Sequence, residues 1–199
     1  MGRVPGLPSK PVGAGHARPA GAPVSAPADP SLARRVSALL DRLPPAAGAP
    51  ISIERVAELS DRRGAAHAGS FLRERRISLA CPRAEFARVF VHEWFHFVWA
   101  RAGNPLRRDF ERLLAAEWDA GARGELGWSA EWRKRELTGR AVRARSRLWR
   151  EYCCESFCDT AAWLYAGIAD HPEFTLAPRF RRRRQAWFAR NVSGRQLSI

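Results

Sequence analysis

The stretch VHEWFHF, residues 91–97, places two of the five histidines of this 199-residue chain four positions apart, with a glutamate directly after the first. Residues four apart share one face of an α-helix, so His92 and His96 can direct their imidazoles to one point in space. Imidazole nitrogens bind zinc at roughly 2.0 to 2.1 Å. Glu93 projects to the side of this pair, where a carboxylate can act as a general base without binding the metal. The stretch therefore predicts a helix with two metal ligands and a catalytic glutamate.

The alternative is an ordinary helix that happens to carry two histidines. The neighbouring side chains are mostly apolar, among them Val91, Trp94, Phe95 and Phe97. A buried imidazole without a polar partner costs free energy, and this helix would carry two of them beside a glutamate. The metal site is the simpler explanation.

Around the motif, the apolar residues from Phe86 to Val98 predict one long helix that ends at Gly103. Before it, Ile77, Leu79 and Cys81 alternate with other residues and predict a strand, and Phe71 is expected to begin an earlier strand of the same small sheet.

Apolar residues at helical spacing continue through the rest of the chain. They predict helices over residues 31–43, 104–118, 129–137 and 140–166, with a weaker helical pattern over 53–59. The expected fold class is α+β and predominantly helical, with a small antiparallel sheet, the histidine helix and a later long helix.

A catalytic zinc needs a third protein ligand and an open position. The last long helix offers Glu151, Glu155 and Asp159 in one stripe at steps of four, beside an apolar face that would pack into the core. Two registers fit this stripe. Either Glu151 is the ligand with Glu155 behind it, or Glu155 is the ligand with Asp159 behind it, orienting a histidine as ligating histidines require.

H-E-x-x-H on one helix and a glutamate on a later helix resemble the gluzincin type of zinc peptidase, and several uncharacterised bacterial peptidases share these motifs. The phrase EYCCESF, residues 151–157, is similar to the E-x-x-A-E-x-F pattern of lethal-factor-type enzymes, and this likeness favours Glu151 as the ligand. The other register is similar to the thermolysin-like E-x-x-x-D pattern. The resemblance implies a zincin-like fold, one Zn²⁺ per chain, Glu93 as general base and a protein or peptide substrate.

Peptidases of this type usually supply a tyrosine, histidine or arginine that stabilises the oxyanion of the tetrahedral intermediate. Tyr152 and His171 are the candidates here.

The chain is strongly basic, with 34 basic and 20 acidic residues and a formal charge of +14. Such a surface attracts nucleic acid without sequence selectivity. Arginines gather at Arg179 and over residues 181–184, close to Trp187 and Phe188. This segment supports an alternative function, a nucleic-acid-binding protein with a structural or non-catalytic metal site. It is equally typical of a helix that lays its aromatic residues on the core.

Residues 1–30 are rich in proline, alanine and glycine and are predicted to be disordered, and residues 31–199 to form a single domain with an arginine-rich end. Three of the four cysteines lie within residues 153–158, which favours a reducing compartment. Cys154 and Cys158 are interpreted as small apolar side chains of a buried helix. No apolar stretch suits a signal peptide or a membrane span, so a cytoplasmic location is expected.

Overall fold

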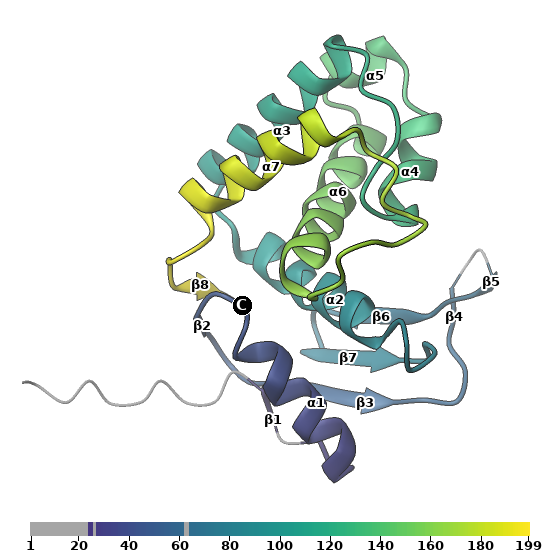
Figure 1. Ribbon diagram of the computed structural model, residues 1–199, viewed down its shortest axis with the longest axis vertical. Coiled ribbons are helices and arrows are strands. Elements are labelled where there is room, and N and C mark those ends of the chain that lie inside the picture. Colours follow the sequence, from purple (N-terminus) through teal and green to yellow (C-terminus); the bar gives the residue numbers. More distant parts are fainter. Residues whose placement is uncertain (1–23, 26, 62–63) are drawn as a thin grey trace, which may run out of the picture.

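The computed structural model describes residues 24, 25, 27–61 and 64–199 (Figure 1). The predicted disorder of residues 1–30 therefore lies largely outside the described residues. At its end, however, Val24–Ser25 forms a short strand, β1, and Pro30 already begins a helix.

The main sheet has four strands in the order β1-β3-β7-β6. Strands β1, β3 (Ile51–Arg55) and β7 (Arg76–Leu79) are parallel, and β6 (Ala68–Phe71) pairs antiparallel with β7. The strand expected before the histidine helix is confirmed. The sheet is mixed, however, so the prediction of an antiparallel sheet is wrong for three of its strands.

The helical pattern over residues 53–59 is also wrong. Ile51 and Ile53 are buried while Ser52 between them is exposed, which is the period of two that a strand shows. Ile53 and Val56 have the spacing of a helix face, but Ile51 and Ile53 alternate with Ser52 as in a strand, and the strand forms.

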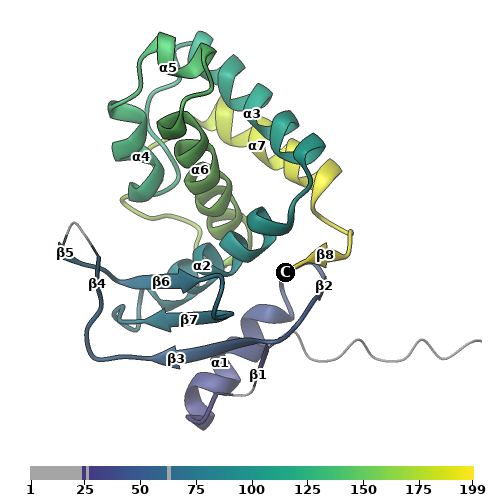
Figure 2. The same cartoon turned by 180° about the vertical axis from the view of Figure 1, so that it is seen from behind.

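Two helices accompany the sheet. The first, α1 (Pro30–Leu40), starts where Asp29 accepts a hydrogen bond from the backbone N–H of Ser31. The second, α2 (Phe86–Arg101), carries the histidines and packs on β6 and β7. In both views α2 lies between the sheet and the remaining helices (Figures 1 and 2), so its motif sits where the two parts of the molecule meet.

The remaining helices form the second layer. They are α3 (Asn104–Asp119), α4 (Trp128–Arg135), α5 (Gly139–Arg143), α6 (Arg147–Tyr165) and α7 (Pro178–Asn191). Helix α6 runs through the middle of this layer, with α4 on one side and α3 and α7 on the other (Figure 2), and it packs along α2. The helix predicted over 140–166 is thus two helices.

The break between α5 and α6 has a local cause. Arg145 adopts a left-handed conformation with φ of 47°, and the Ser146 side chain accepts a hydrogen bond from the N–H of Trp149, so a new helix starts there.

Aromatic side chains from four helices form the centre of the helical layer. Phe110 of α3 lies 4.8 Å from Trp187 of α7 between ring centroids, and Phe157 of α6 lies 5.0 Å from Phe188 of α7, with Phe95 of α2 beside them. These distances are those of favourable aromatic pairs. The arginine-rich segment thus forms a helix, α7, that packs its aromatic residues on the core.

One arginine of that segment lies inside the protein. Arg184 is fully buried and pairs with Glu117 at 2.7 Å and Glu125 at 2.6 Å, and Lys134 reaches Glu125 at 2.9 Å. Burial disfavours the charged carboxylate of Glu125, but the charge and hydrogen bonds of Arg184 outweigh it and lower its pKa to about 2. The cluster ties α3, α4, α6 and α7 together.

Within the described ranges, no helix has the length and apolar character that crossing a membrane requires.

Candidate metal centre

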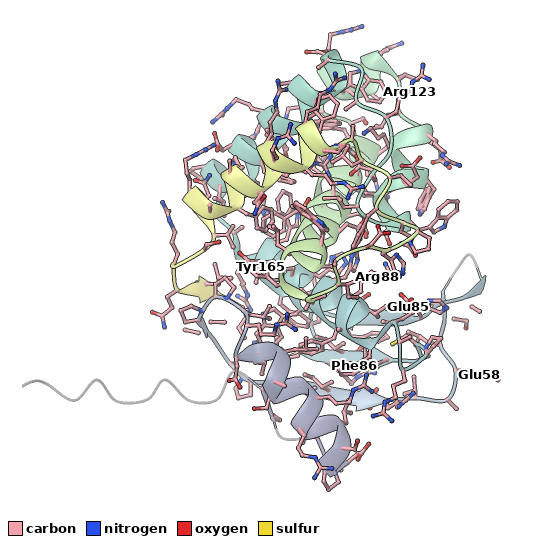
Figure 3. All side chains as sticks on the ribbon, in the orientation of Figure 1. Glu58, Glu85, Phe86, Arg88, Arg123 and Tyr165 are labelled. Atoms are coloured by element: carbon pink, nitrogen blue, oxygen red, sulfur yellow. The ribbon has the colours of Figure 1, made fainter. Side chains whose placement is uncertain are left out.

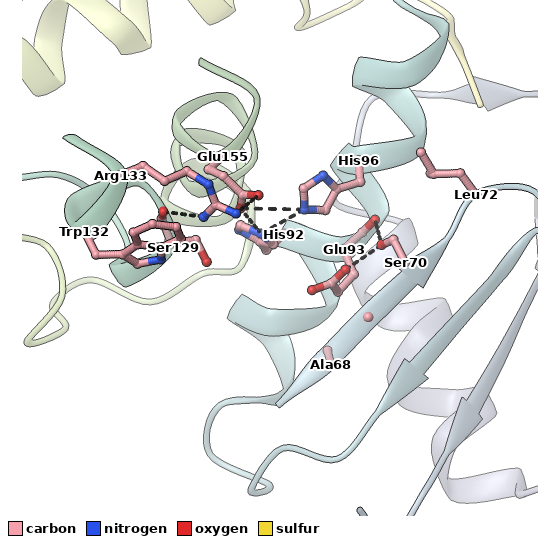
Figure 4. Close-up of a pocket in the computed structure, with 11 residues that line it drawn as sticks. Ala68, Ser70, Leu72, His92, Glu93, His96, Ser129, Trp132, Arg133 and Glu155 are labelled. Carbon is pink, nitrogen blue, oxygen red and sulfur yellow. Dashed lines mark hydrogen bonds and ion pairs between the residues drawn. The ribbon is translucent and has the colours of Figure 1, made fainter. Parts of the chain in front are cut away.

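The two histidines of α2 meet Glu155 of α6 where these helices pack together (Figure 4). His92 Nε2 lies 3.3 Å from Glu155 Oε2 and 3.1 Å from His96 Nε2. The third separation, from His96 Nε2 to Glu155 Oε2, is 3.8 Å. Three donor atoms from two helices therefore converge on one point.

These separations suit a tetrahedral zinc ion. Two donors bound at 2.0 to 2.1 Å with a tetrahedral angle between them lie roughly 3.3 Å apart. Two of the three observed separations fall within a few tenths of an ångström of that value, and the third is half an ångström longer. The set of two imidazoles and one carboxylate is one that catalytic zinc sites use.

The other ring nitrogen of each histidine also has a partner on α6. His92 Nδ1 lies 2.7 Å from Asp159 Oδ1, and His96 Nδ1 lies 3.5 Å from Cys154 Sγ. Partners of this kind fix the tautomer and the orientation of a metal-binding imidazole. Both rings are thereby held with Nε2 directed at the shared point.

Helix α4 supports the same arrangement through Asp159. The backbone N–H of Ala130, in the first turn of α4, donates to Asp159 Oδ2 at 3.2 Å. This N–H belongs to the first turn of a helix, where backbone donors lack partners within the helix. The carboxylate thus joins the start of α4 to the imidazole of His92.

The charges around the shared point favour a cation. Burial alone would lower the pKa of His92 and His96, but Asp159 raises the first, and Cys154 with Glu155 raises the second to about 9. Burial likewise opposes the charge of Glu155, yet the hydrogen bond from His92 and the charge of His96 lower its pKa to about 2. Protons on the two imidazoles supply the positive charge that balances these acidic groups. A bound metal ion would replace those protons and supply the charge instead.

A charge count around the donors gives the same result. With both imidazoles neutral, as metal ligands must be, Glu93, Glu155 and Asp159 carry three negative charges and Arg133 carries one positive charge. The groups around the donors therefore carry more negative than positive charge, which favours a cation at the shared point. The residues present therefore fit a zinc ion in geometry, and their excess of negative charge suits a cation.

Glu93 lies in the same pocket without joining the convergent donors. The pocket has a volume of about 320 Å³ and is lined by residues of β6, α2, α4 and α6, including Ser70, His96 and Trp132. The hydroxyl of Ser70 donates to the Glu93 carboxylate (Figure 4). This contact holds Glu93 in the pocket that the two histidines and Glu155 also line.

The structure does not bring Glu151, the residue favoured as third ligand, to the two histidines. Glu151 lies one helical turn before Glu155, is partly exposed, and pairs with Arg147 on its own helix at 2.7 Å. It is displaced by one turn along α6 and is not among the donors that converge with the two histidines. The second register, with Glu155 as the carboxylate and Asp159 behind His92, is the one that the fold brings together.

Neither residue proposed to stabilise an oxyanion lies at the pocket. Tyr152 is almost fully buried and donates its hydroxyl to Glu125 at 2.6 Å, within the ion-pair cluster of Arg184. His171 Nε2 lies 3.2 Å from Glu85 Oε1, near the start of α2, where Glu85 also pairs with Arg88 (Figure 3). Both side chains thus make their polar contacts outside the pocket.

Arg133 is the pocket residue that sequence reasoning missed. Its Nη2 lies 3.1 Å from Glu155 Oε1, its Nη1 donates to the carbonyl of Ser129 at 2.7 Å, and its guanidinium stacks over Trp132. Its Nε is buried without a hydrogen-bond partner among the described residues. No motif spacing marks this arginine, because α4 joins the site only through its packing on α6.

The arginine-rich segment is partly used within the fold, although Arg179, Arg182 and Arg183 are exposed. Arg184 is buried, and Arg181 donates to the backbone carbonyls of Leu176 and Phe174. Arg179 and Arg183 lie over the ring of Phe180.

Comparison of the chain with protein-family models, with curated proteins and with solved structures finds no match. The geometry of the pocket is therefore what supports a function.

Proposed function

We propose that the protein is a zinc-dependent peptidase in which His92, His96 and Glu155 hold the metal and Glu93 is the general base. The observation that carries this proposal is the convergence of three donor atoms from α2 and α6, with Glu93 lining the same pocket. The zincin-like fold and the resemblance to gluzincins suggested by the motif belong to the same proposal.

A zinc ion held there would supply Lewis-acid chemistry and lower the pKa of a water molecule toward about 7. Glu93 would accept a proton from the attacking water and return it to the leaving amine. Ser70 holds this carboxylate by a hydrogen bond, so its position does not depend on substrate.

Arg133 would stabilise the negative charge that develops on the carbonyl oxygen. One carboxylate oxygen of Glu155 faces Arg133, and the other faces the histidines, so the guanidinium is fixed next to the reacting centre. Donors held in place before the reaction are worth several kcal/mol at such a site.

The edge strand β6 suits an extended peptide as substrate. Strand β6 ends the four-stranded sheet, and its residues 68–70 line the pocket. The carbonyl of His67 accepts from the N–H of Ala80, next to the strand pairing of β6 with β7, so by alternation the backbone groups of Ala68 and Ser70 face away from β7. A peptide paired with this edge would cross the pocket with its main chain held.

The experiment that tests the proposal separates binding of zinc from hydrolysis. Purified protein is measured for metal by mass spectrometry and for cleavage of a mixed peptide library, beside the variants Glu93→Gln and Glu58→Gln. We expect one zinc per chain in all three and hydrolysis only in the wild type and the Glu58 control. A zinc-loaded wild type that cleaves no peptide, or a Glu93→Gln variant that still does, would overturn the proposal.

Nucleic-acid binding is the second candidate, supported by the net charge of +14. The contacts of the arginine-rich helix favour it less, since Arg181 and Arg184 are used within the fold.

A further inference from the structure

Helix α6 carries a second set of metal-ligand donors beside the candidate metal centre. Cys154 and Cys158 lie four residues apart on α6, and Cys154 Sγ is 3.5 Å from His96 Nδ1. The three donor atoms all lie within 4.8 Å of one another. The sequence favours small apolar roles for both cysteines, but it does not show that α2 brings an imidazole nitrogen to them.

The spacing of this set suits a bound ion. Zinc holds thiolate sulfur at roughly 2.3 Å and imidazole nitrogen at roughly 2.0 to 2.1 Å, which places the two donors roughly 3.6 Å apart in a tetrahedral site. The separation between Cys154 Sγ and His96 Nδ1 is 3.5 Å. The distance between these two donors is thus already that of a metal site. Cys158 supplies the third donor from the same face of α6.

The chemistry of the donors favours a more thiophilic ion than the donor set of the first centre does. Thiolates are soft ligands that prefer soft ions with a filled d shell, whereas two imidazoles and a carboxylate suit borderline ions. Two thiolates and a neutral imidazole would also cancel the charge of a divalent ion. This matters because Cys158 is fully buried, where an uncompensated charge is costly.

We propose that His96, Cys154 and Cys158 form a second metal site, for thiophilic divalent ions such as Cd²⁺, which competes with the candidate metal centre for His96. A neutral imidazole has one nitrogen free to act as an acceptor, because the other carries the proton. The first centre uses His96 Nε2 and the second uses His96 Nδ1. An ion held by the cysteines therefore withdraws His96 from the first centre.

Cadmium is the probe, because cadmium bound to thiolate shows a charge-transfer absorption in the ultraviolet that cadmium on imidazole and carboxylate lacks. Metal-free, reduced protein is titrated with Cd²⁺. We expect the absorption to saturate at one ion per chain. The variants Cys154→Ser and Cys158→Ala, tested separately, should each lose most of it, whereas Cys81→Ala and Cys153→Ala should keep it.

The two controls are matched to the test variants. Cys153 and Cys81 are buried thiols outside the set, and circular dichroism of each variant checks that the helices remain. Absence of the absorption in the wild type, its survival when Cys154 and Cys158 are both replaced, or an equal loss in Cys153→Ala would overturn the proposal.

Two further measurements separate this site from the proposed peptidase. Glu155→Ala removes a ligand of the first centre alone, so it should leave the cadmium absorption unchanged. In the wild type, one equivalent of Cd²⁺ should release zinc from the zinc-loaded protein, and it should fail to do so in Cys154→Ser. A protein that cleaves no peptide yet passes these tests would refute the peptidase and leave the thiolate site standing. Zinc retained in the wild type would refute the competition.

Discussion

A single turn of helix decides which acidic residue of α6 joins the two histidines. Glu151 and Glu155 have the same side chain and sit four residues apart, but only Glu155 has a carboxylate oxygen within 3.3 Å of His92 Nε2. The local phrase around them resembles a pattern in which the earlier glutamate is the ligand. The packing of α6 on α2 selects the later one instead.

Replacing each glutamate by alanine tests this choice. Glu155→Ala removes a donor and is expected to weaken zinc binding by at least about 100-fold, beyond what loss of an orienting partner costs. Glu151→Ala, on the same helix, breaks only a surface pair with Arg147 and should keep the affinity. Competition with a chromophoric chelator measures both. A larger loss for Glu151→Ala would restore the first register.

Arg133 permits a second test on one side chain. Arg133→Met keeps much of the length of the side chain and removes its charge, so kcat should fall by about 10²-fold or more while KM changes little. Zinc content should stay at one per chain, because Arg133 contacts Glu155 Oε1 and not the oxygen that faces the histidines. Arg135→Met, on the exposed side of α4, is the control. An unchanged kcat in Arg133→Met would remove it from the reaction.

At the scale of elements, the centre depends on how closely the turn before α4 approaches α6. Gly127 has an extended backbone with φ of −176°, which any residue can adopt. The position requires glycine for lack of room, since a Cβ there would lie 2.2 Å from the carboxylate carbon of Asp159. Residue 127 must therefore lack a side chain for the carboxylate of Asp159 to reach His92.

Gly127→Ala is accordingly expected to displace Asp159 and misorient the imidazole of His92. Loss of such an orienting contact typically weakens metal binding by about 10- to 100-fold. Isothermal titration with Zn²⁺ measures the effect. Gly103→Ala is the control, because a Cβ there meets only Pro105 at an ordinary contact distance of 3.6 Å. Equal affinities in the two variants would show that Asp159 tolerates the shift or that it does not act through His92.

For the whole molecule, the buried cluster of Arg184, Glu117 and Glu125 links the helices that surround α6. A buried ion pair adds little over an apolar core, but removal of one partner leaves an uncompensated charge. Glu125 accepts from Arg184, Lys134 and Tyr152, so its carboxylate is the common partner of three elements.

Glu125→Gln should therefore lower the free energy of unfolding by about 3–5 kcal/mol at neutral pH. The folded pKa of Glu125, about 2, lies below the ordinary value, so its contribution to stability is present above about pH 4.5 and is lost as the pH falls toward 2. Urea unfolding between pH 6 and pH 2 should show a smaller pH dependence in the variant than in the wild type. Parallel curves would contradict this role of Glu125.

The periodicity of the sequence already determined the helix of the two histidines, the strand before it and an acidic stripe on a later helix. These features follow from local spacing, because residues four apart share a helix face and alternating residues share a strand face. The ligand spacing of His92 and His96 is a property of one helix, which explains why it was predicted from seven residues.

Only the tertiary structure decided that Glu155, and not Glu151, lies next to the histidines. It also decided that Asp159 contacts His92, that Arg133 lines the pocket and that Cys154 contacts His96. Each depends on how α6 packs against α2 and α4, and many side chains determine that packing at once. A sequence pattern reports which residues share one element. It does not report the angle at which two elements pack, and the site lies between elements.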